Sequence, residues 1–166
     1  MRAINRILTH FILIPCTLCI GCSSHSQTIN TKKLATEWIN ILNKHDTVAL
    51  ALLYSDSVTM ESPNWEGIRI GRAVVKDTYS RYFASTPDMQ QEITDIIASD
   101  STVVIEYTFA GTLLNPEKNT PEYMHGKKYK LSACTVMSIR KGKITRQQTY
   151  FDQVSFLRQV GFFEQK

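Results

Sequence analysis

The stretch at residues 127–152, KKYKLSACTVMSIRKGKITRQQTYFD, decides the fold. Its two halves, 127–140 and 143–152, are predicted to be β-strands, and Lys141-Gly142 between them is a tight-turn signal. Strands of about 12 residues are unusually long for a flat sheet. Such strands curl strongly and enclose space, so this stretch predicts a bent sheet with a hollow side.

The flanking residues extend this sheet in both directions. Residues 89–99 and 102–114 are predicted to form two further strands around the turn signal Asp100-Ser101, and a loop with two prolines covers 115–125. Downstream, residues 153–160 show a helical pattern that Gly161 is placed to end. The carboxy-terminal half is therefore antiparallel sheet followed by one short helix.

The amino-terminal half is predicted to be mostly helical. A first helix begins at Thr31, its expected N-cap, because apolar residues recur at the spacing of a buried helical stripe. Two more helices (47–54, capped by Asp46, and 72–83) enclose a short strand at 55–61. Helices first and long strands afterwards predict an α+β fold in which three helices cover the open side of the sheet. The result is one domain, 31–166, with a conical pocket.

The first 21 residues are predicted to be a targeting segment. Arg2 and Arg6 precede an almost entirely apolar run at 7–20, the pattern of a secretory signal. Ile20-Gly21-Cys22 then resembles the bacterial lipoprotein box, which implies a lipid on Cys22 and attachment to the cell envelope, in the periplasm or outer membrane. The alternative is a plain secretory signal cut nearby. Residues 22–30, small and polar, are predicted to be a flexible tether.

Charge and cysteine content exclude several classes of protein. The 166 residues contain 19 basic and 15 acidic side chains, and without residues 1–21, which hold two of the basic ones, the balance falls from +4 to +2. This predicts no nucleic-acid partner. Removal of that segment and lipidation of Cys22 would leave Cys134 as the one free thiol, so no intrachain disulfide is expected. The spacing of histidines and cysteines predicts no metal site, and no motif predicts a cofactor.

Several motifs, in order, resemble the SnoaL-like polyketide cyclases of the nuclear-transport-factor-2-like superfamily. The motifs are Asp56-Ser57-Val58, Gly71-Arg72-Ala73-Val74-Val75, Thr86-Pro87-Asp88-Met89, His125-Gly126-Lys127, Gly142-Lys143-Ile144, Tyr150-Phe151-Asp152-Gln153 and 156–161. The resemblance implies a cone-shaped α+β barrel, often a homodimer through the outer face of its sheet. The fold hosts cyclases, isomerases and proteins that only bind, so it does not decide function.

Asp152 is the predicted catalytic residue. It ends the last strand, and simple alternation places Tyr150 and Gln148 on the same side, facing the pocket. A carboxylate at the mouth of an apolar pocket has a raised pKa and can abstract a proton. The resemblance implies general acid–base catalysis by this aspartate. The alternative role is the N-cap of the helix that begins at Gln153.

Neither mechanism known in related enzymes is complete in this sequence. The preceding strand lacks the histidine that SnoaL-like cyclases pair with the aspartate, and 102–114 lacks the Arg-x-Asp of limonene epoxide hydrolases. Tyr107 is a candidate hydrogen-bond donor, Glu61 is a second carboxylate to consider, and the resemblance places Trp65 and Tyr82 near the pocket mouth. Two hypotheses stay open: a small, largely apolar molecule is converted with Asp152 as acid–base, or the domain is a non-enzymatic binding or interaction module.

Overall fold

The computed structural model describes residues 22–164 as one α+β domain. The elements in chain order are α1 (Cys22–Asn43), α2 (Thr47–Leu52), β1 (Tyr54–Glu61), β2 (Arg69–Ile70), α3 (Arg72–Ser85), β3 (Gln90–Ala98), β4 (Thr102–Thr112), η1 (Glu122–Met124), β5 (Lys128–Arg140), β6 (Lys143–Phe151) and α4 (Gln153–Gln159). The predicted strands and helices are all present, with ends that differ by a few residues, except that α1 begins earlier. The short strand β2 and the 3-10 turn η1 were not anticipated.

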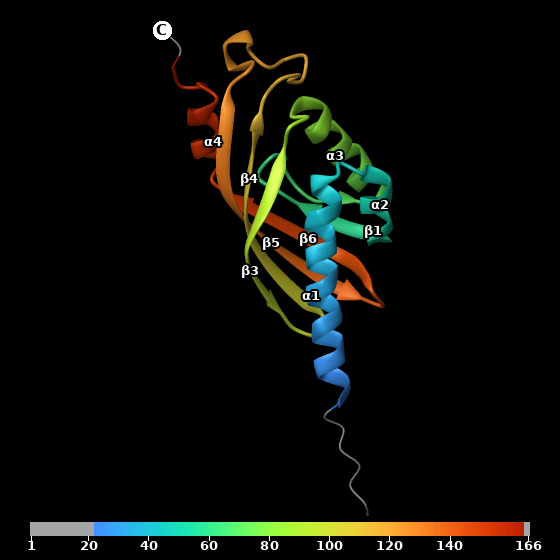
Figure 1. The fold of residues 1–166 in the computed structure, drawn as a ribbon. Coiled ribbons are helices and arrows are strands. Elements are labelled where there is room, and N and C mark those ends of the chain that lie inside the picture. The colour runs from blue at the N-terminus through green and yellow to red at the C-terminus, as the bar shows by residue number, and fades with distance from the viewer. Residues whose placement is uncertain (1–21, 165–166) are drawn as a thin grey trace, which may run out of the picture.

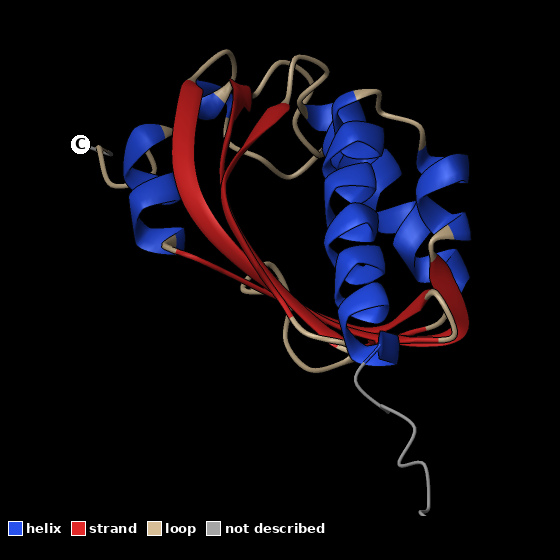
Figure 2. Ribbon diagram, turned by 60° about the horizontal axis from the view of Figure 1, so that its bottom comes forward, coloured by secondary structure: helices blue, strands red, loops and turns tan. Residues whose placement is uncertain are grey.

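The six strands form one mixed sheet in the order β2-β1-β6-β5-β4-β3. Neighbouring strands are antiparallel except β1 and β6, which are parallel. The sheet curves strongly, and the three amino-terminal helices lie across its concave side while α4 lies at its far end (Figures 1 and 2). The sheet is an open cone rather than a closed barrel, because β2 and β3 are its two edges.

The long strands alternate as their sequence predicts. Along β5, every second residue from Tyr129 to Ile139 is buried, and β4 continues the same layer with Val103, Ile105 and Tyr107. Trp38 of α1 packs on this layer and is 1% exposed. The turn Lys141-Gly142 has positive φ at both residues and joins Arg140 directly to Lys143, as predicted for a tight hairpin.

A β-bulge interrupts the alternation along β6. Ile144 pairs with Ile139, but Arg146 pairs with Ser138, so Thr145 is an extra residue on this strand. Each extra residue reverses which side chains face inward. Ile144 is fully buried, and the next buried side chain is that of Gln147, not Gln148. Beyond the bulge, the odd-numbered residues of β6 therefore face inward, whereas simple alternation from Ile144 would place the even-numbered residues there.

Helix α1 begins at Cys22, nine residues before the predicted start. Thr31 is not its N-cap but lies inside the helix, 3% exposed, and its hydroxyl donates to the carbonyl of Ser99 at 2.6 Å. The prediction of a flexible tether over 22–30 is therefore wrong, because this segment continues α1 toward the turn between β3 and β4. The predicted signal segment, 1–21, lies outside the described residues, and so does the side chain of Cys22.

Candidate functional site

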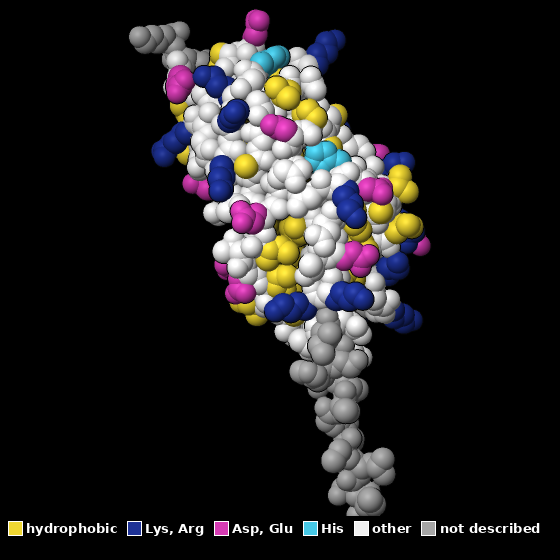
Figure 3. Space-filling view, in the orientation of Figure 1, with side chains coloured by type: hydrophobic (Ala, Val, Ile, Leu, Met, Phe, Trp, Pro, Cys, Tyr) yellow, Lys and Arg dark blue, Asp and Glu magenta, His cyan; other side chains and the backbone are white. Residues whose placement is uncertain are grey.

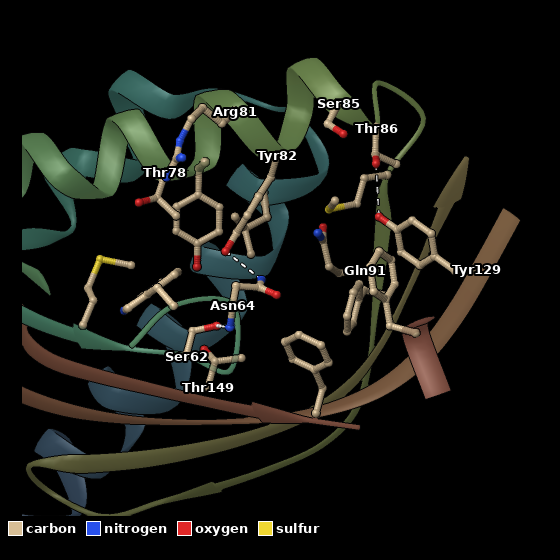
Figure 4. A pocket seen from close by; sticks show the side chains of 18 of the residues that line it. Ser62, Asn64, Thr78, Arg81, Tyr82, Ser85, Thr86, Gln91, Tyr129 and Thr149 are labelled. Atoms are coloured by element: carbon tan, nitrogen blue, oxygen red, sulfur yellow. Dashed lines mark hydrogen bonds between the residues drawn. The ribbon is translucent and has the colours of Figure 1, made fainter. Parts of the chain in front are cut away.

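A cavity of about 260 Å3 lies between the concave face of the sheet and the helices (Figure 4). Its wall is rich in aromatic side chains, with contributions from α1, α3, α4, the five strands β1, β3, β4, β5 and β6, and the loops after β1, α3 and β4. The aromatic residues are Trp38, Trp65, Tyr79, Tyr82, Tyr107, Phe109, Tyr129, Phe151 and Phe156. Three of them, Trp65, Tyr82 and Tyr107, are candidates from the sequence. The wall suits a flat, largely apolar guest.

Asp152 does not line this cavity. Its side chain is exposed and accepts a hydrogen bond from the backbone N–H of Ser155 at 3.0 Å, which makes it the N-cap of α4. The prediction that it faces the pocket is wrong, because the bulge at Thr145 turns the end of β6 by one residue. From the strand, Gln147, Thr149 and Phe151 reach the cavity instead.

Gln148 and Tyr150 lie outside the cavity for the same reason, and Glu61 of β1, which pairs with Gln148, lies outside it too. Tyr150 is 51% exposed on the convex face of the sheet. Gln148 donates to Glu61 at 2.9 Å, and Glu61 also pairs with Arg146 at 3.5 Å. Gln148, Glu61 and Arg146 thus form a polar cluster on the outside of β1 and β6. The prediction that Gln148, Tyr150 and Glu61 contact a ligand in the pocket is wrong.

A chain of buried hydrogen bonds forms the floor of the cavity, and sequence analysis did not find it. The indole N–H of Trp38 donates to the Tyr54 hydroxyl at 2.6 Å, and that hydroxyl donates to the side-chain carbonyl of Gln147. The amide N–H groups of Gln147 donate to Tyr79 at 3.0 Å and Thr149 at 3.1 Å. The Thr149 hydroxyl is hydrogen-bonded to the Thr135 hydroxyl at 3.0 Å, and the Thr135 hydroxyl is hydrogen-bonded to that of Tyr107 at 3.1 Å.

Burial keeps the tyrosines of this chain in their neutral form. Removal from water raises the pKa of Tyr107 to about 12 and raises the pKa of Tyr54 and of Tyr79 well above the ordinary value. Burial likewise raises the pKa of Tyr82 and of Tyr129. At neutral pH these side chains are hydroxyl donors and acceptors rather than bases.

Polar side chains at the cavity mouth are mostly paired with one another. Asn64 donates its amide to the Tyr82 hydroxyl at 2.8 Å, as Figure 4 shows, and Arg69 lies 4.3 Å from the ring centre of Trp65. Arg81 and Glu117 pair at 3.4 Å with both side chains largely in solvent. They are the charged residues among the described residues that line the cavity.

Three side chains of the wall bury a polar atom that has no hydrogen-bond partner among residues 22–164. These atoms are Nε1 of Trp65, Oγ1 of Thr78 and Oε1 of Gln91. Thr78 is 1% exposed and Gln91 is 8% exposed. Buried polar atoms are nearly always hydrogen-bonded in folded proteins, so unpaired ones that cluster at a cavity indicate a missing partner. Thr78 and Gln91 carry no motif in the sequence that would have identified them.

Within residues 22–164, no group of three or more His, Cys, Asp or Glu side chains is arranged to hold a metal ion.

The family of the chain follows from comparison with known proteins. Residues 35–147 match a family model described as a SnoaL-like domain, which spans more than half of the chain. The chain belongs to this family. The matched region begins within α1 at Ala35, includes α2 and α3, and extends through the sheet as far as Gln147 of β6. It therefore includes most of the residues that line the cavity. The comparison with curated proteins found no match.

Solved structures share the fold of this SnoaL-like domain. A candidate polyketide cyclase from Xanthomonas campestris pv. campestris has 20% identity and a TM-score of 0.69, over 81% of this chain and 98% of that chain. A second, from Silicibacter sp. TM1040, has 24% identity and a TM-score of 0.67, over 78% and 94%. A Catenulispora acidiphila protein of ketosteroid isomerase-like fold, in complex with trimethylamine, has 22% identity and a TM-score of 0.65, over 78% and 92%. At these identities the likeness shows the fold.

Proposed function

We propose that this SnoaL-like domain binds a small, uncharged, largely apolar molecule in the cavity and does not convert it by acid–base chemistry. The observation that carries this proposal is the composition of the wall. It is aromatic, its inner polar groups are hydroxyls and amides, and the carboxylate expected to act as base caps a helix outside it.

Acid–base catalysis needs a group that exchanges a proton near neutral pH within reach of the ligand. The buried tyrosines are unsuited to this role because burial raises their pKa values. The wall residue Glu117 is solvated at the mouth and paired with Arg81. A fixed set of neutral donors and acceptors in an apolar wall instead favours selective binding.

A ligand screen with the purified full chain tests this proposal. A compound that co-purifies and is recovered chemically unchanged after prolonged incubation is the expected result. Ser85→Trp should block binding because Ser85 lines the cavity, whereas Ala84→Trp at the exposed neighbouring position should not. Recovery of a converted product, or equal binding by both variants, would contradict the proposal.

We also propose that the chain is exported and anchored by a lipid on Cys22 to the bacterial envelope, in the periplasm or the outer membrane. The motif Ile20-Gly21-Cys22 supports this. Helix α1 begins at Cys22, so a lipid there would be joined to the domain by helix rather than coil. No helix within residues 22–164 has both the length and the apolar character needed to span a bilayer.

Fractionation of cells tests the anchor. The Cys22→Ser variant should no longer be found in the detergent-soluble membrane fraction. It should also carry no lipid, which metabolic labelling with a fatty acid detects directly. Cys16→Ser, a cysteine of the leader segment outside the lipoprotein box, is the matched control and should keep the label. Labelling that persists in the Cys22 variant would disprove lipidation at this residue.

A homodimer through the convex face of the sheet is a further part of the proposal. This face leaves Ile97 60% and Tyr150 51% exposed, which is apolar surface that a second copy would cover. On the side of the molecule that Figure 3 shows, positive and negative side chains are intermixed. Light scattering should give twice the chain mass, and Tyr150→Glu should shift it toward the monomer.

A further inference from the structure

We infer that Gln91 sets the specificity of the cavity, and that its carboxamide selects a flat, neutral ligand with a lactam-type edge, an N–H donor beside a carbonyl acceptor. This inference rests on the proposed binding function and names the chemical class that the cavity would take.

The position of Gln91 is fixed by its backbone. Gln91 is the second residue of β3, and its N–H donates to Oδ1 of Asn43 at 2.7 Å while its carbonyl accepts from Nδ2 of Asn43 at 2.8 Å. A side-chain amide at the end of α1 thus substitutes for a neighbouring strand. Because both backbone groups are held, the side chain enters the cavity from a rigid point.

Gln91 differs from the other two carboxamides of the wall. Asn64 donates to Tyr82 at 2.8 Å, and Gln147 lies within the hydrogen-bonded floor. The carbonyl oxygen of Gln91 has no partner in the described part of the chain, although the side chain is 8% exposed. Figure 4 shows this side chain reaching into the cavity opposite the loop that carries Ser62 and Asn64. A ligand is the partner that the geometry provides for.

The chemistry of the amide defines the matching ligand edge. Its oxygen accepts a hydrogen bond and its NH2 group donates one, so the complementary edge has one donor and one acceptor side by side. Phe109 is the cross-strand neighbour of Gln91, and Tyr129 lies at a ring-centre distance of 6.0 Å from Phe109. Aromatic rings beside a planar amide favour a planar ring as the guest. A neutral cyclic amide meets all of these requirements.

Three fused-ring probes of similar shape separate this inference from the broader proposal. Isoquinolone carries the lactam edge, N-methylisoquinolone lacks its donor, and naphthalene lacks both polar groups. Affinities of the full chain for each are measured by quenching of tryptophan fluorescence or by calorimetry. We expect isoquinolone to bind about tenfold more tightly than the N-methyl compound, because a buried acceptor left unpaired costs about 1–3 kcal/mol.

Substitution of Gln91 then assigns the preference to this residue. Gln91→Met keeps the length and removes the hydrogen bonds, and it should reduce the preference to about one while naphthalene binds as well or better. Gln91→Leu is a second variant of the same kind. Gln90→Leu, at the exposed neighbouring residue, is the matched control and should keep the preference. The methyl group of N-methylisoquinolone has the same steric effect in every variant, so this effect cancels when the affinity ratios of the variants are compared.

The outcomes are distinct. Naphthalene binding without a lactam preference in the unmodified chain would overturn the inference and leave the binding proposal standing. A preference that survives in both Gln91 variants would also overturn it. If none of the three probes binds, the proposed function fails, and the inference fails with it.

Discussion

The substitution Gln147→Leu tests the arrangement of β6 and the floor of the cavity together. Gln147 is 3% exposed, and the Tyr54 hydroxyl donates to its side-chain carbonyl. Loss of this acceptor leaves the buried O–H donor of Tyr54 without a partner, which costs about 1–3 kcal/mol. Tyr79 and Thr149 each lose one donor, at about 0.5–1.5 kcal/mol apiece. Burial of the new leucine offsets part of this, so we expect a net loss of about 3 kcal/mol.

Gln148→Leu is the matched control, because it makes the same chemical change one residue further along. Gln148 lies on the convex face and is half-buried, with one hydrogen bond to Glu61. A surface change of this kind alters the free energy of unfolding by about 0.5 kcal/mol or less. Without the bulge at Thr145, the order of the two effects would be reversed.

Urea unfolding of the two variants gives the comparison. With a slope of about 2 kcal/mol per molar urea, Gln147→Leu should lower the midpoint by about 1.5 M and Gln148→Leu by about 0.25 M or less. Adding Tyr54→Phe to Gln147→Leu should cost less than Tyr54→Phe alone, because the two groups are coupled. Equal midpoints for the two glutamine variants, or a larger loss for Gln148→Leu, would refute the assignment of the inner face.

Three further predictions concern the helix cap, the buried tyrosines and a close contact. Asp152→Asn should leave stability and ligand affinity nearly unchanged, and Asp152→Ala should cost about 1 kcal/mol in urea unfolding without loss of affinity, because its role is the cap of α4. The contribution of the buried tyrosines to stability should be constant below about pH 10 and fall above it, since an unfolded chain releases tyrosine protons near pH 10 whereas Tyr107 holds its proton to about 12; an ultraviolet titration in which all tyrosines ionise before unfolding would contradict this. Gly111→Ala should cost about 1–3 kcal/mol, because the new Cβ would clash with Cγ2 of Thr86, and Thr86→Ser should recover part of that loss in a thermal melt.

Local signals in the sequence were enough for most of the fold. Turn residues determine where the long strands end, as at Lys141-Gly142, where both residues have positive φ. Asp46 caps α2 as predicted, with its side chain accepting from the N–H groups of Val48 and Ala49. Features of this kind depend on residues that are close in the chain, so a single sequence contains them.

The candidate site was harder to predict because it depends on contacts between distant segments. Alternation counted along β6 fails at Thr145, where the extra residue is visible only from the pairing with β5. For the same reason, Gln91 had no local signal, since Asn43 holds it from another element. Tyr107 was predicted from its residue type and strand, and Trp65 and Tyr82 from the family resemblance; none of these three predictions depends on counting alternation along β6.

The bulge at Thr145 also bears on how such a domain can acquire new chemistry. If Thr145 itself paired with Ser138, the bulge would disappear and every later residue of β6 would move by one pairing position, which would turn Gln148 and Tyr150 into the interior and carry Asp152 toward it. This change of register would replace an amide-and-hydroxyl lining by one with an acidic neighbour, whereas deletion of Thr145 would not, because Gln147 would still pair with Met137. In this architecture, the step between a passive receptor and a proton-transfer enzyme is one of strand phase rather than of new residues.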